Sequence, residues 1–339
     1  MAKVGKQTWS FKNSPRILGS SAVGGPKEGE GPLRDDFDVL HDDPYVGQKN
    51  WEKAEEQLLK ESIQMAVKKA GLQSDQIDMV IAGDLINQIS ISNFSARSLG
   101  IPFYGIFGAC STSMQGLALA AQLVDSGYAY YAVAATSSHN ATAERQFRYP
   151  TEYGGQKPPT AHCTVTGAGA ALVGKGTEGP MITFATIGKV IDMGIKSPWE
   201  MGSAMAPAAA DTILAHFRDT GRTPDDYDLI ITGDLARVGN PIARDLLEKE
   251  GCSVSEKFTD CGILIYNPDQ PDVFSGGSGC ACCAAVTYGH LMKRIRKGDL
   301  KRVLVVATGA LLSPLTVQQG ETIPCIAHAV SIEAGGETS

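Results

Sequence analysis

The sequence has little of what membrane-spanning, secreted or nucleic-acid-binding proteins need. Charged residues make up 20% of the 339 residues, and the formal net charge is -7. An acidic chain without a long Lys/Arg block is a poor nucleic-acid binder. The first 20 residues contain no apolar core of a signal peptide. The longest uncharged stretch, residues 99–124, contains Pro102 and several glycines, so it predicts a buried strand, a turn and a buried helix rather than a bilayer span.

Cysteine is present, but not in the spacing of a disulfide framework or a zinc site. The eight cysteines are Cys110, Cys163, Cys252, Cys261, Cys280, Cys282, Cys283 and Cys325. In a chain this long and Gly-rich they do not predict a disulfide framework. The run from Cys280 to Cys283 has no second cluster at zinc-site spacing. We therefore expect buried thiols in a reducing compartment, with no metal site and no cofactor.

The strongest internal signal is a repeat at an offset of 150 residues. Residues 71–85 (GLQSDQIDMVIAGDL) align with residues 221–235 (GRTPDDYDLIITGDL), with seven identical pairs in fifteen positions. Each copy predicts a helix that ends at a Gly, an Asp-rich turn, and a short apolar strand followed by Gly-Asp-Leu. The predicted helices cover residues 51–70 and 203–220, and the predicted strands cover 79–82 and 229–232.

A second correspondence extends the repeat to most of the chain. Helices are predicted over residues 111–125 and 282–296, each followed by a Gly turn and a strand over 131–135 or 302–307. Each half thus runs helix, strand, helix, strand, which predicts two similar α/β halves. The expected divisions are an N-terminal strand and loop region at 1–50, a first half at 51–175 and a second half at 176–339.

Two segments lie outside the repeat. Residues 23–50 are rich in Gly, Pro and acids and predict a surface loop. Residues 139–162 form a long insertion with Pro and aromatics, which predicts an ordered functional loop. The insertion leads into residues 163–174 (CTVTGAGAALVG), which predict a buried strand with close backbone approach at its glycines.

Residues 107–113 (FGACSTS) carry the first recognisable site. A strand ends, a tight Gly turn follows, and Cys110 opens an apolar helix. This resembles the nucleophile position of thiolases and of β-ketoacyl synthase III-type condensing enzymes, and residues 164–174 resemble their TGAGA-type core strand. The resemblance, over about residues 51–330, implies an α/β thiolase fold: duplicated βαβαβ halves packed as α-β-α-β-α layers. Relatives with this fold are commonly dimers, so a homodimer is expected by analogy.

The whole sequence more narrowly resembles the stage V sporulation protein AD family of spore-forming Bacilli. The stretch TAERQFRYPTEYGGQKPPTA, the following TVTGAGAALVG and the paired Gly-Asp-Leu strand ends carry this resemblance. It implies binding of dipicolinic acid (pyridine-2,6-dicarboxylate), free or as its calcium chelate. It also implies a peripheral subunit at the spore inner membrane, whose ligand is taken up into the developing spore and released at germination through membrane proteins of the same operon.

An acyl-CoA-dependent condensing enzyme or acyltransferase that uses Cys110 is the alternative. Such an enzyme needs a thiolate, oxyanion donors and a His or Asn. A helix N-terminus would lower the pKa of Cys110 and supply the thiolate. However, residues 233–236 read Gly-Asp-Leu-Ala where condensing enzymes have His-Gln-Ala-Asn, and the later turn at 276–280 has no Asn. The incomplete set predicts a non-catalytic protein, with His162 and His139 left open as alternative bases.

The expected ligand site is the old reaction pocket, where the two halves meet. The helix that Cys110 opens offers N–H donors to an anion, and three hydroxyls follow it, although these could simply cap the helix. Asp84 and Asp234 follow equivalent strands, so they either meet at one site, facing a pyridinium or a ligand-bound cation, or each cap the next segment. The candidate ligand-binding residues are Cys110, Asp84, Asp234, Ser111, Thr112, Ser113, Arg145, His162 and Gly277.

The ligand carboxylates also need a positive partner. Arg suits bidentate carboxylate recognition, but the sequence does not choose among several cations. The candidates are Arg97, Arg145, Arg148 and Lys157. A purely structural scaffold in a membrane complex is the third function that the sequence leaves open.

Overall fold

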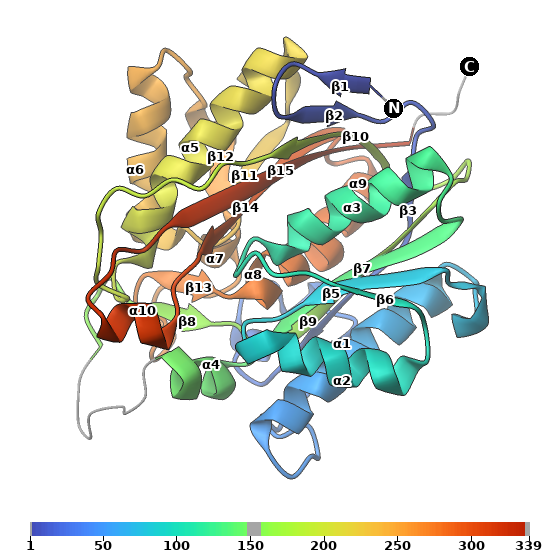
Figure 1. Ribbon diagram of the computed structural model, residues 1–339, viewed down its shortest axis with the longest axis horizontal. Coiled ribbons are helices and arrows are strands. Elements are labelled where there is room, and N and C mark those ends of the chain that lie inside the picture. The colour runs from blue at the N-terminus through green and yellow to red at the C-terminus, as the bar shows by residue number, and fades with distance from the viewer. Residues whose placement is uncertain (1, 148–156, 336–339) are drawn as a thin grey trace.

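Two five-stranded sheets of the same design form the frame of the molecule. The computed structural model describes residues 2–147 and 157–335 (Figure 1). The first sheet runs β3-β9-β7-β5-β6 and the second runs β10-β15-β14-β11-β12. In both, the second strand in this order is antiparallel to its neighbours and the last three are parallel. This matching order confirms the predicted duplication.

The strands of the first sheet are β3 (Arg16–Gly24), β9 (Gly167–Gly174), β7 (Tyr131–Ser138), β5 (Met79–Gly83) and β6 (Phe103–Gly105). Those of the second are β10 (Met181–Ile187), β15 (Cys325–Glu333), β14 (Arg302–Ala310), β11 (Leu229–Thr232) and β12 (Phe258–Asp260). The small strands are β1 (Ala2–Val4), β2 (Thr8–Ser10), β4 (Val39–Leu40), β8 (His162–Thr164) and β13 (Gly276–Ser278). The pairing of Met181 with Arg16 joins the two large sheets into one continuous sheet of 13 described strands, which also includes β1, β2 and β4.

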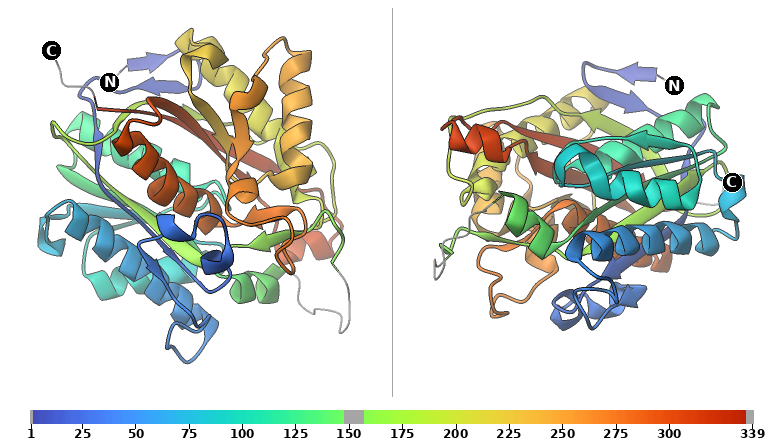
Figure 2. Two further views of the ribbon diagram at one scale, coloured as in Figure 1. Left: turned by 180° about the vertical axis from the view of Figure 1, so that it is seen from behind. Right: turned by 60° about the horizontal axis from the view of Figure 1, so that its bottom comes forward.

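Helices form three layers around these sheets. α1 (Trp51–Lys69) and α2 (Ser90–Leu99) pack on the outer side of the first sheet, and α5 (Met201–Thr220) and α6 (Ala236–Lys249) on the outer side of the second (Figures 1 and 2). Between the sheets lie α3 (Thr112–Ser126), α8 (Cys280–Ala285) and α9 (Met292–Lys297). The predicted α-β-α-β-α layers of the thiolase fold are confirmed. The short helices are α4 (Asn140–Phe147), α7 (Cys261–Leu264) and α10 (Pro314–Gln318).

The predicted helix ends are confirmed at four glycines. Gly71, Gly127, Gly221 and Gly298 all have φ between +71° and +84°. This left-handed conformation costs Gly little and ends a helix by turning its last carbonyls toward new donors. The same stop residue therefore ends the equivalent helix in each half.

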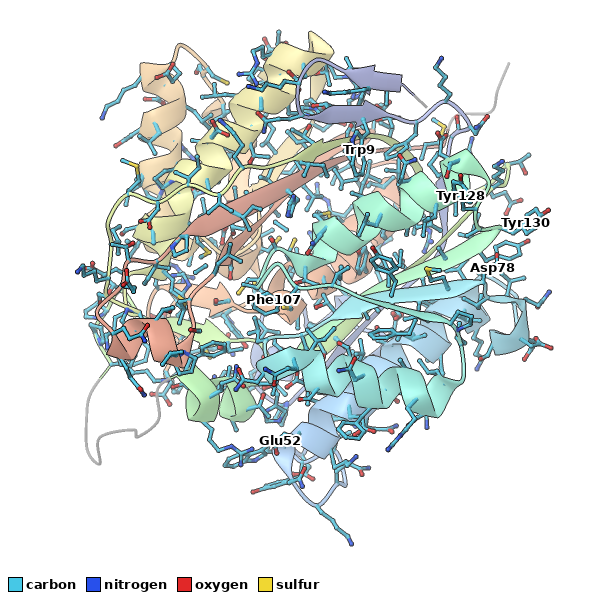
Figure 3. All side chains as sticks on the ribbon, in the orientation of Figure 1. Trp9, Glu52, Asp78, Phe107, Tyr128 and Tyr130 are labelled. Atoms are coloured by element: carbon cyan, nitrogen blue, oxygen red, sulfur yellow. The ribbon has the colours of Figure 1, made fainter. Side chains whose placement is uncertain are left out.

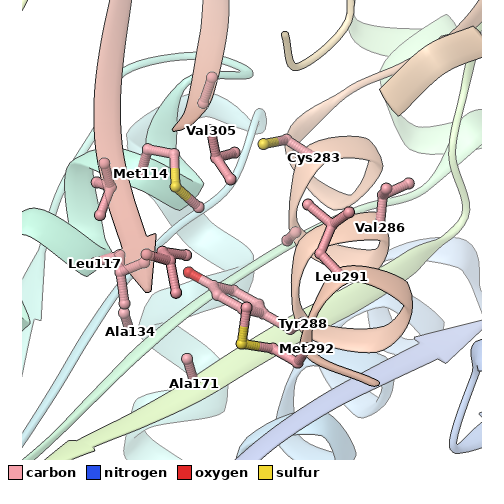
Figure 4. Close-up of a cluster of buried hydrophobic side chains, with 14 of the residues drawn as sticks. Met114, Leu117, Ala134, Ala171, Cys283, Val286, Tyr288, Leu291, Met292 and Val305 are labelled. Atoms are coloured by element: carbon pink, nitrogen blue, oxygen red, sulfur yellow. The ribbon is translucent and has the colours of Figure 1, made fainter. Parts of the chain in front are cut away.

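The central layer holds the site in place through its packing. Met114 and Leu117 of α3 lie against Tyr288 and Met292, which follow α8 through the π-helical segment Val286–Leu291 (Figure 4). All four side chains are buried. The Tyr288 hydroxyl also donates to the Ser113 carbonyl oxygen at 3.2 Å. Close packing and this hydrogen bond fix the first turn of α3, which directly follows Cys110.

Three local predictions need correction. The insertion at residues 139–162 is not only a loop, because α4 occupies its start and buries Thr142 and Ala143; its residues 148–156 lie outside the described part. The strand predicted over 163–174 is two strands, and β8 leaves the large sheet to pair with β13. The surface loop predicted over 23–50 includes Glu28, which is buried.

The cysteines, the potential metal ligands and the lengths of the helices can be compared with what the sequence predicts. The eight cysteines are free thiols, and those from Cys280 to Cys283 are buried in α8, as predicted. Within residues 2–147 and 157–335, no group of three or more His, Cys, Asp or Glu is arranged to hold a metal ion. None of the helices in those ranges combines the length and the apolar character that crossing a bilayer requires.

Candidate ligand pocket

One pocket lies beside Cys110, where segments from both halves converge. It has a volume of about 560 Å³ with its open mouth included. Phe107, which lines it, lies near the middle of the face shown in Figure 3, away from Tyr128 and Tyr130. The lining residues are Leu85, Phe107, Ala109, Cys110, Ala143, Phe147, Thr164, Pro198, Met201, Ser278, Ala310 and Leu312. An apolar slot with two hydroxyls on its wall suits a small organic ligand.

A strained turn presents Cys110 to the pocket. Ala109 has φ +49°, a conformation that residues with a Cβ rarely adopt. Two hydroxyls hold the turn: Ser111 Oγ donates to the Gly108 carbonyl oxygen at 2.6 Å, and Thr112 Oγ1 donates to that of Ala109 at 2.7 Å. Both hydroxyl protons are therefore donated to backbone carbonyl oxygens. Of the four candidates from Cys110 to Ser113, only Cys110 lines the pocket.

Asp234 lies behind the pocket wall and collects hydrogen bonds from it. Its side chain accepts from Thr308 Oγ1 at 2.6 Å, from Ser278 Oγ at 2.9 Å and from the Gly279 N–H at 3.3 Å. The Cys110 thiol lies beside the same carboxyl group and interacts with it electrostatically. Asp234 is 1% exposed, and burial raises its pKa. The carboxyl group therefore joins the turn before α3 to β13 and β14.

The prediction of a low Cys110 pKa is wrong. Burial raises the pKa of this thiol well above its ordinary value, and the charge of Asp234 raises it further. The helix N-terminus does not compensate, because α3 begins only at Thr112. A protonated thiol is a weak nucleophile.

Asp84 does not enter the pocket. Its carboxyl group accepts from the Ile86 N–H at 2.9 Å and from the N–H and Oγ of Ser92 at 2.8 and 2.6 Å. It thus holds the segment that follows β5, which was the alternative to a shared site with Asp234. The two repeat positions have diverged: Asp84 anchors its own segment, whereas Asp234 bonds pocket residues.

Sequence reasoning missed a buried acid that faces Asp84. Glu55 of α1 accepts from Ser137 Oγ at 3.1 Å and from Thr142 Oγ1 at 2.7 Å. Burial, and then the charge of Asp84, raise the pKa of Glu55 to about 8. Because Thr142 belongs to α4, this acid links α1 to the helix that carries Ala143 and Phe147 into the pocket.

The candidates His162 and Gly277 lie around the pocket and are not among the residues that line it. His162 is buried in β8, and its Nε2 lies 3.2 Å from where a Cβ on Gly202 would stand, at the start of α5. Gly277 of β13 pairs with Cys163. A Cβ at Gly277 would lie 2.6 Å from the Ile265 side chain, so this position needs a glycine for packing.

The other five histidines make hydrogen bonds away from Cys110. Their partners are Glu61 for His41, Pro44 for His139, Tyr227 for His216, Asp36 for His290 and Gly188 for His328. Burial lowers the pKa of His139, whose Nε2 lies 2.8 Å from the Pro44 carbonyl oxygen. His139 is therefore held by the backbone rather than by the thiol.

The cationic candidates have partners on the surface. Arg145 pairs with Glu52 and lies over the Trp51 ring at 5.8 Å. Arg97 lies over the Phe94 ring at 4.7 Å, and Lys157 pairs with Glu144 at 3.0 Å. Arg148 lies outside the described residues. No Lys or Arg lines the pocket in the described part of the chain.

The pocket residues that the sequence did not reveal come from three kinds of segment. Phe147 and Ala143 lie in the insertion for which the sequence predicts a loop. Thr164 and Ser278 lie in recognisable motifs of the sequence, but only the β8–β13 pairing brings them to one wall. Met201 lies at the start of α5, where the sequence carries no polar signal.

Known proteins that are similar to the chain fall into two groups. The profile of the family Stage V sporulation protein AD (SpoVAD) matches residues 5–333. The Stage V sporulation protein AD of Bacillus subtilis (strain 168) is 57% identical over 339 residues, which is 100% of both chains.

Solved structures supply the second group. The 3-oxoacyl-[acyl-carrier-protein] synthase III of Aquifex aeolicus VF5 superposes with a TM-score of 0.58 at 16% identity, covering 94% of this chain and 99% of that one. The C143A variant of Xanthomonas campestris OleA gives 0.62 at 14% identity, covering 95% and 98%. At such low identity, these likenesses establish the thiolase-like fold alone.

Proposed function

Because the chain belongs to the stage V sporulation protein AD family, we propose that its pocket binds dipicolinic acid and does not transform it. The ligand enters free or as its calcium chelate. The chain then serves as a peripheral subunit of a spore inner-membrane transport complex, with membrane proteins of the same operon as partners, in uptake by the developing spore and release at germination. The observation that carries the non-catalytic part is the burial of the Cys110 thiol beside the buried carboxyl group of Asp234.

The proximity of this acid to the thiol argues against acyl transfer on physical grounds. A condensing enzyme needs an ionised thiol and a group that stabilises negative charge next to it. Here the thiol faces an acid, and both burial and that acid raise its pKa. A carboxylate at this position would repel an enolate or a thiolate. The geometry favours a receptor over an acyl-CoA-dependent enzyme.

The shape and chemistry of the pocket support a small planar acid. Phe107 and Phe147 line it from different segments, and such rings favour stacking on an aromatic ligand. Thr164 and Ser278 offer hydroxyls on one wall. A pyridine ring with two carboxyl groups therefore has apolar faces for the rings and polar edges for the hydroxyls.

Calorimetric titration with dipicolinate and, in parallel, with acetyl-CoA tests this proposal. We expect one dipicolinate per chain, no heat from acetyl-CoA, and an unchanged intact mass after incubation with acetyl-CoA. Repeating the titration with and without Ca²⁺ separates the free acid from the chelate. An acetyl group on Cys110, together with no dipicolinate binding, would establish the enzyme instead.

We also propose that the chain forms a homodimer through the outer edge of β6. In the described residues β6 pairs only with β5, so its other edge offers free backbone groups. Tyr104 on this strand is 55% exposed, and Phe94 and Phe107 are also exposed. An unpaired edge beside exposed aromatics suits a second copy of the same edge.

We expect Tyr104→Lys to convert this dimer into a monomer in size-exclusion chromatography with light scattering. The added charges would face each other across a twofold axis and repel. Met193→Lys is the matched control, because Met193 is 66% exposed but lies in the other half. A wild-type chain that is already monomeric at high concentration would rule out the dimer.

A further inference from the structure

Two polar side chains that line the pocket, Ser278 and Cys110, face the same buried acid, Asp234, and we call these two side chains the pocket floor. Ser278 Oγ donates to Asp234 Oδ2 at 2.9 Å, and the Cys110 thiol lies beside the same carboxyl group and interacts with it. A hydroxyl and a thiol each have one proton to give. While both protons point at Asp234, the floor presents lone pairs to the ligand.

Such a floor repels an anion, and the Thr164 hydroxyl is the one other polar side chain among the described lining residues. No Lys or Arg is among the described lining residues. The remaining partners of Asp234 are also donors, namely Thr308 and the Gly279 N–H, so its carboxyl group is arranged to accept on both oxygens. An ionised ligand would therefore meet both acceptor atoms and a buried negative charge.

We propose that Asp234 sets the direction of the hydrogen bonds on the pocket floor, so that the pocket holds an anionic acid only while Asp234 carries a proton. The proton comes from solvent and resides on Oδ2. It donates to Ser278 Oγ, whose own proton then turns to the ligand carboxylate, and the Cys110 thiol is likewise released. Apart from the O–H bond that this proton forms with Oδ2, only hydrogen bonds change. The inference rests on the proposed function, because it concerns an acidic ligand in the same pocket.

The groups around Asp234 favour this protonation. Those that interact with it electrostatically are Cys110, Asp260 at the end of β12, Cys282 of α8 and Cys325 of β15. The three thiols carry no charge while they are protonated, so the neighbour that becomes charged is Asp260, whose own pKa burial raises to about 7. Burial likewise raises the pKa of Asp234. A bound anion adds negative charge and raises the pKa of Asp234 further. Binding is therefore coupled to protonation of Asp234, and ligand affinity must fall as the pH rises.

Calorimetric dissociation constants for dipicolinate at pH 6, 7, 8 and 9 test the inference. Carboxylic acids ionise near pH 4, about two units below this range, so the ligand charge stays constant. We expect Kd of the wild type to rise at least about tenfold from pH 6 to pH 9. In Asp234→Asn, whose amide imitates the protonated acid, it should change less than about twofold. Asp84→Asn, at the equivalent repeat position but outside the pocket, should keep the wild-type slope.

A flat wild-type profile, or the same slope in Asp234→Asn, would overturn the inference. Ser278→Ala is a second variant that leaves the acid in place. It removes the hydroxyl that connects Asp234 to the ligand carboxylate. This variant should weaken binding at pH 6 at least about tenfold and change Kd at pH 9 less than about twofold. Equal affinity at pH 6 in the wild type and Ser278→Ala would also count against it.

A readout without dipicolinate separates this inference from the proposed function. The ratio of Cys110 alkylation by iodoacetate to that by iodoacetamide, followed by mass spectrometry at pH 8, reports the local charge. We expect Asp234→Asn to raise this ratio at least about threefold. An unchanged ratio contradicts an ionisable Asp234 beside the thiol. If the ratio rises but dipicolinate does not bind, the proposed ligand is wrong, whereas the conclusion that Asp234 sets the charge beside Cys110 is kept.

Discussion

Replacing Ala143 by Trp is expected to lower dipicolinate affinity at least about a hundredfold, below the range of calorimetry. Ala143 lies on α4 and faces the pocket. An indole there fills the slot between Phe107 and Phe147 and leaves no room for a second ring. The measurement is a titration of the purified variant, with its circular dichroism and thermal midpoint compared with those of the wild type.

Ala141 provides the matched control for this substitution. It lies on the same helix but lines a different cavity, beside Trp51 and His139. Ala141→Trp should therefore bind dipicolinate within about threefold of the wild type. The opposite pattern, with binding lost in Ala141→Trp and kept in Ala143→Trp, would move the ligand to the cavity at Trp51.

Glu55→Gln is expected to make the protein more stable at alkaline pH. The ordinary pKa of this side chain is 4.5, and in the fold it is about 8, raised by burial and by the charge of Asp84. The folded state therefore keeps a proton that the unfolded chain releases above about pH 4.5. Stability that depends on this proton is intact below pH 4.5 and is lost as the pH rises toward 8.

Gln keeps the size of Glu55 without the charge, so the variant should not lose that stability. One pKa unit corresponds to about 1.4 kcal/mol, which predicts a gain of roughly 2–5 kcal/mol over the wild type at pH 9 and less than about 1 kcal/mol at pH 5. Urea unfolding at both pH values measures this difference. Glu56→Gln, one residue along α1 on its outer side and paired with Lys53, should follow the wild type. A Glu55→Gln variant that is less stable at both pH values would show that the acid is needed in its charged form.

The layers, the duplication and most helix ends could be predicted from the sequence because they depend on local patterns. The aligned Gly-Asp-Leu segments locate β5 and β11, and the glycines at 71 and 221 stop the helices before them. These signals act within a few residues, where apolar periodicity and the conformational freedom of Gly decide the structure.

The site itself depends on contacts between distant segments, which local patterns do not carry. Cys110 follows a Gly turn and precedes a helix, and this pattern alone predicts a low pKa. The fold instead places Asp234, 124 residues later by its number, against the thiol and buries both. The same limit hid Glu55, which looks like an ordinary helix residue until Asp84 and Thr142 pack against it.

Repeat symmetry was also an incomplete guide to the acids. Asp84 and Asp234 align in the sequence, but Ser92 gives Asp84 a local partner in its own half. The side-chain hydrogen bonds to Asp234 come from β13 and β14, and the Cys110 thiol lies beside it. Equivalent positions thus keep their backbone placement while their side chains take different roles.

A crystal structure of the chain soaked with dipicolinate below pH 7 would show directly whether the pocket beside Cys110 is a receptor for this acid. We expect the pyridine ring between Phe107 and Phe147, a carboxylate within hydrogen-bonding distance of Ser278 Oγ, and an unmodified Cys110 sulfur. An empty pocket at saturating ligand, a ligand in the cavity at Trp51 and His139, or an acyl group on Cys110 would contradict it.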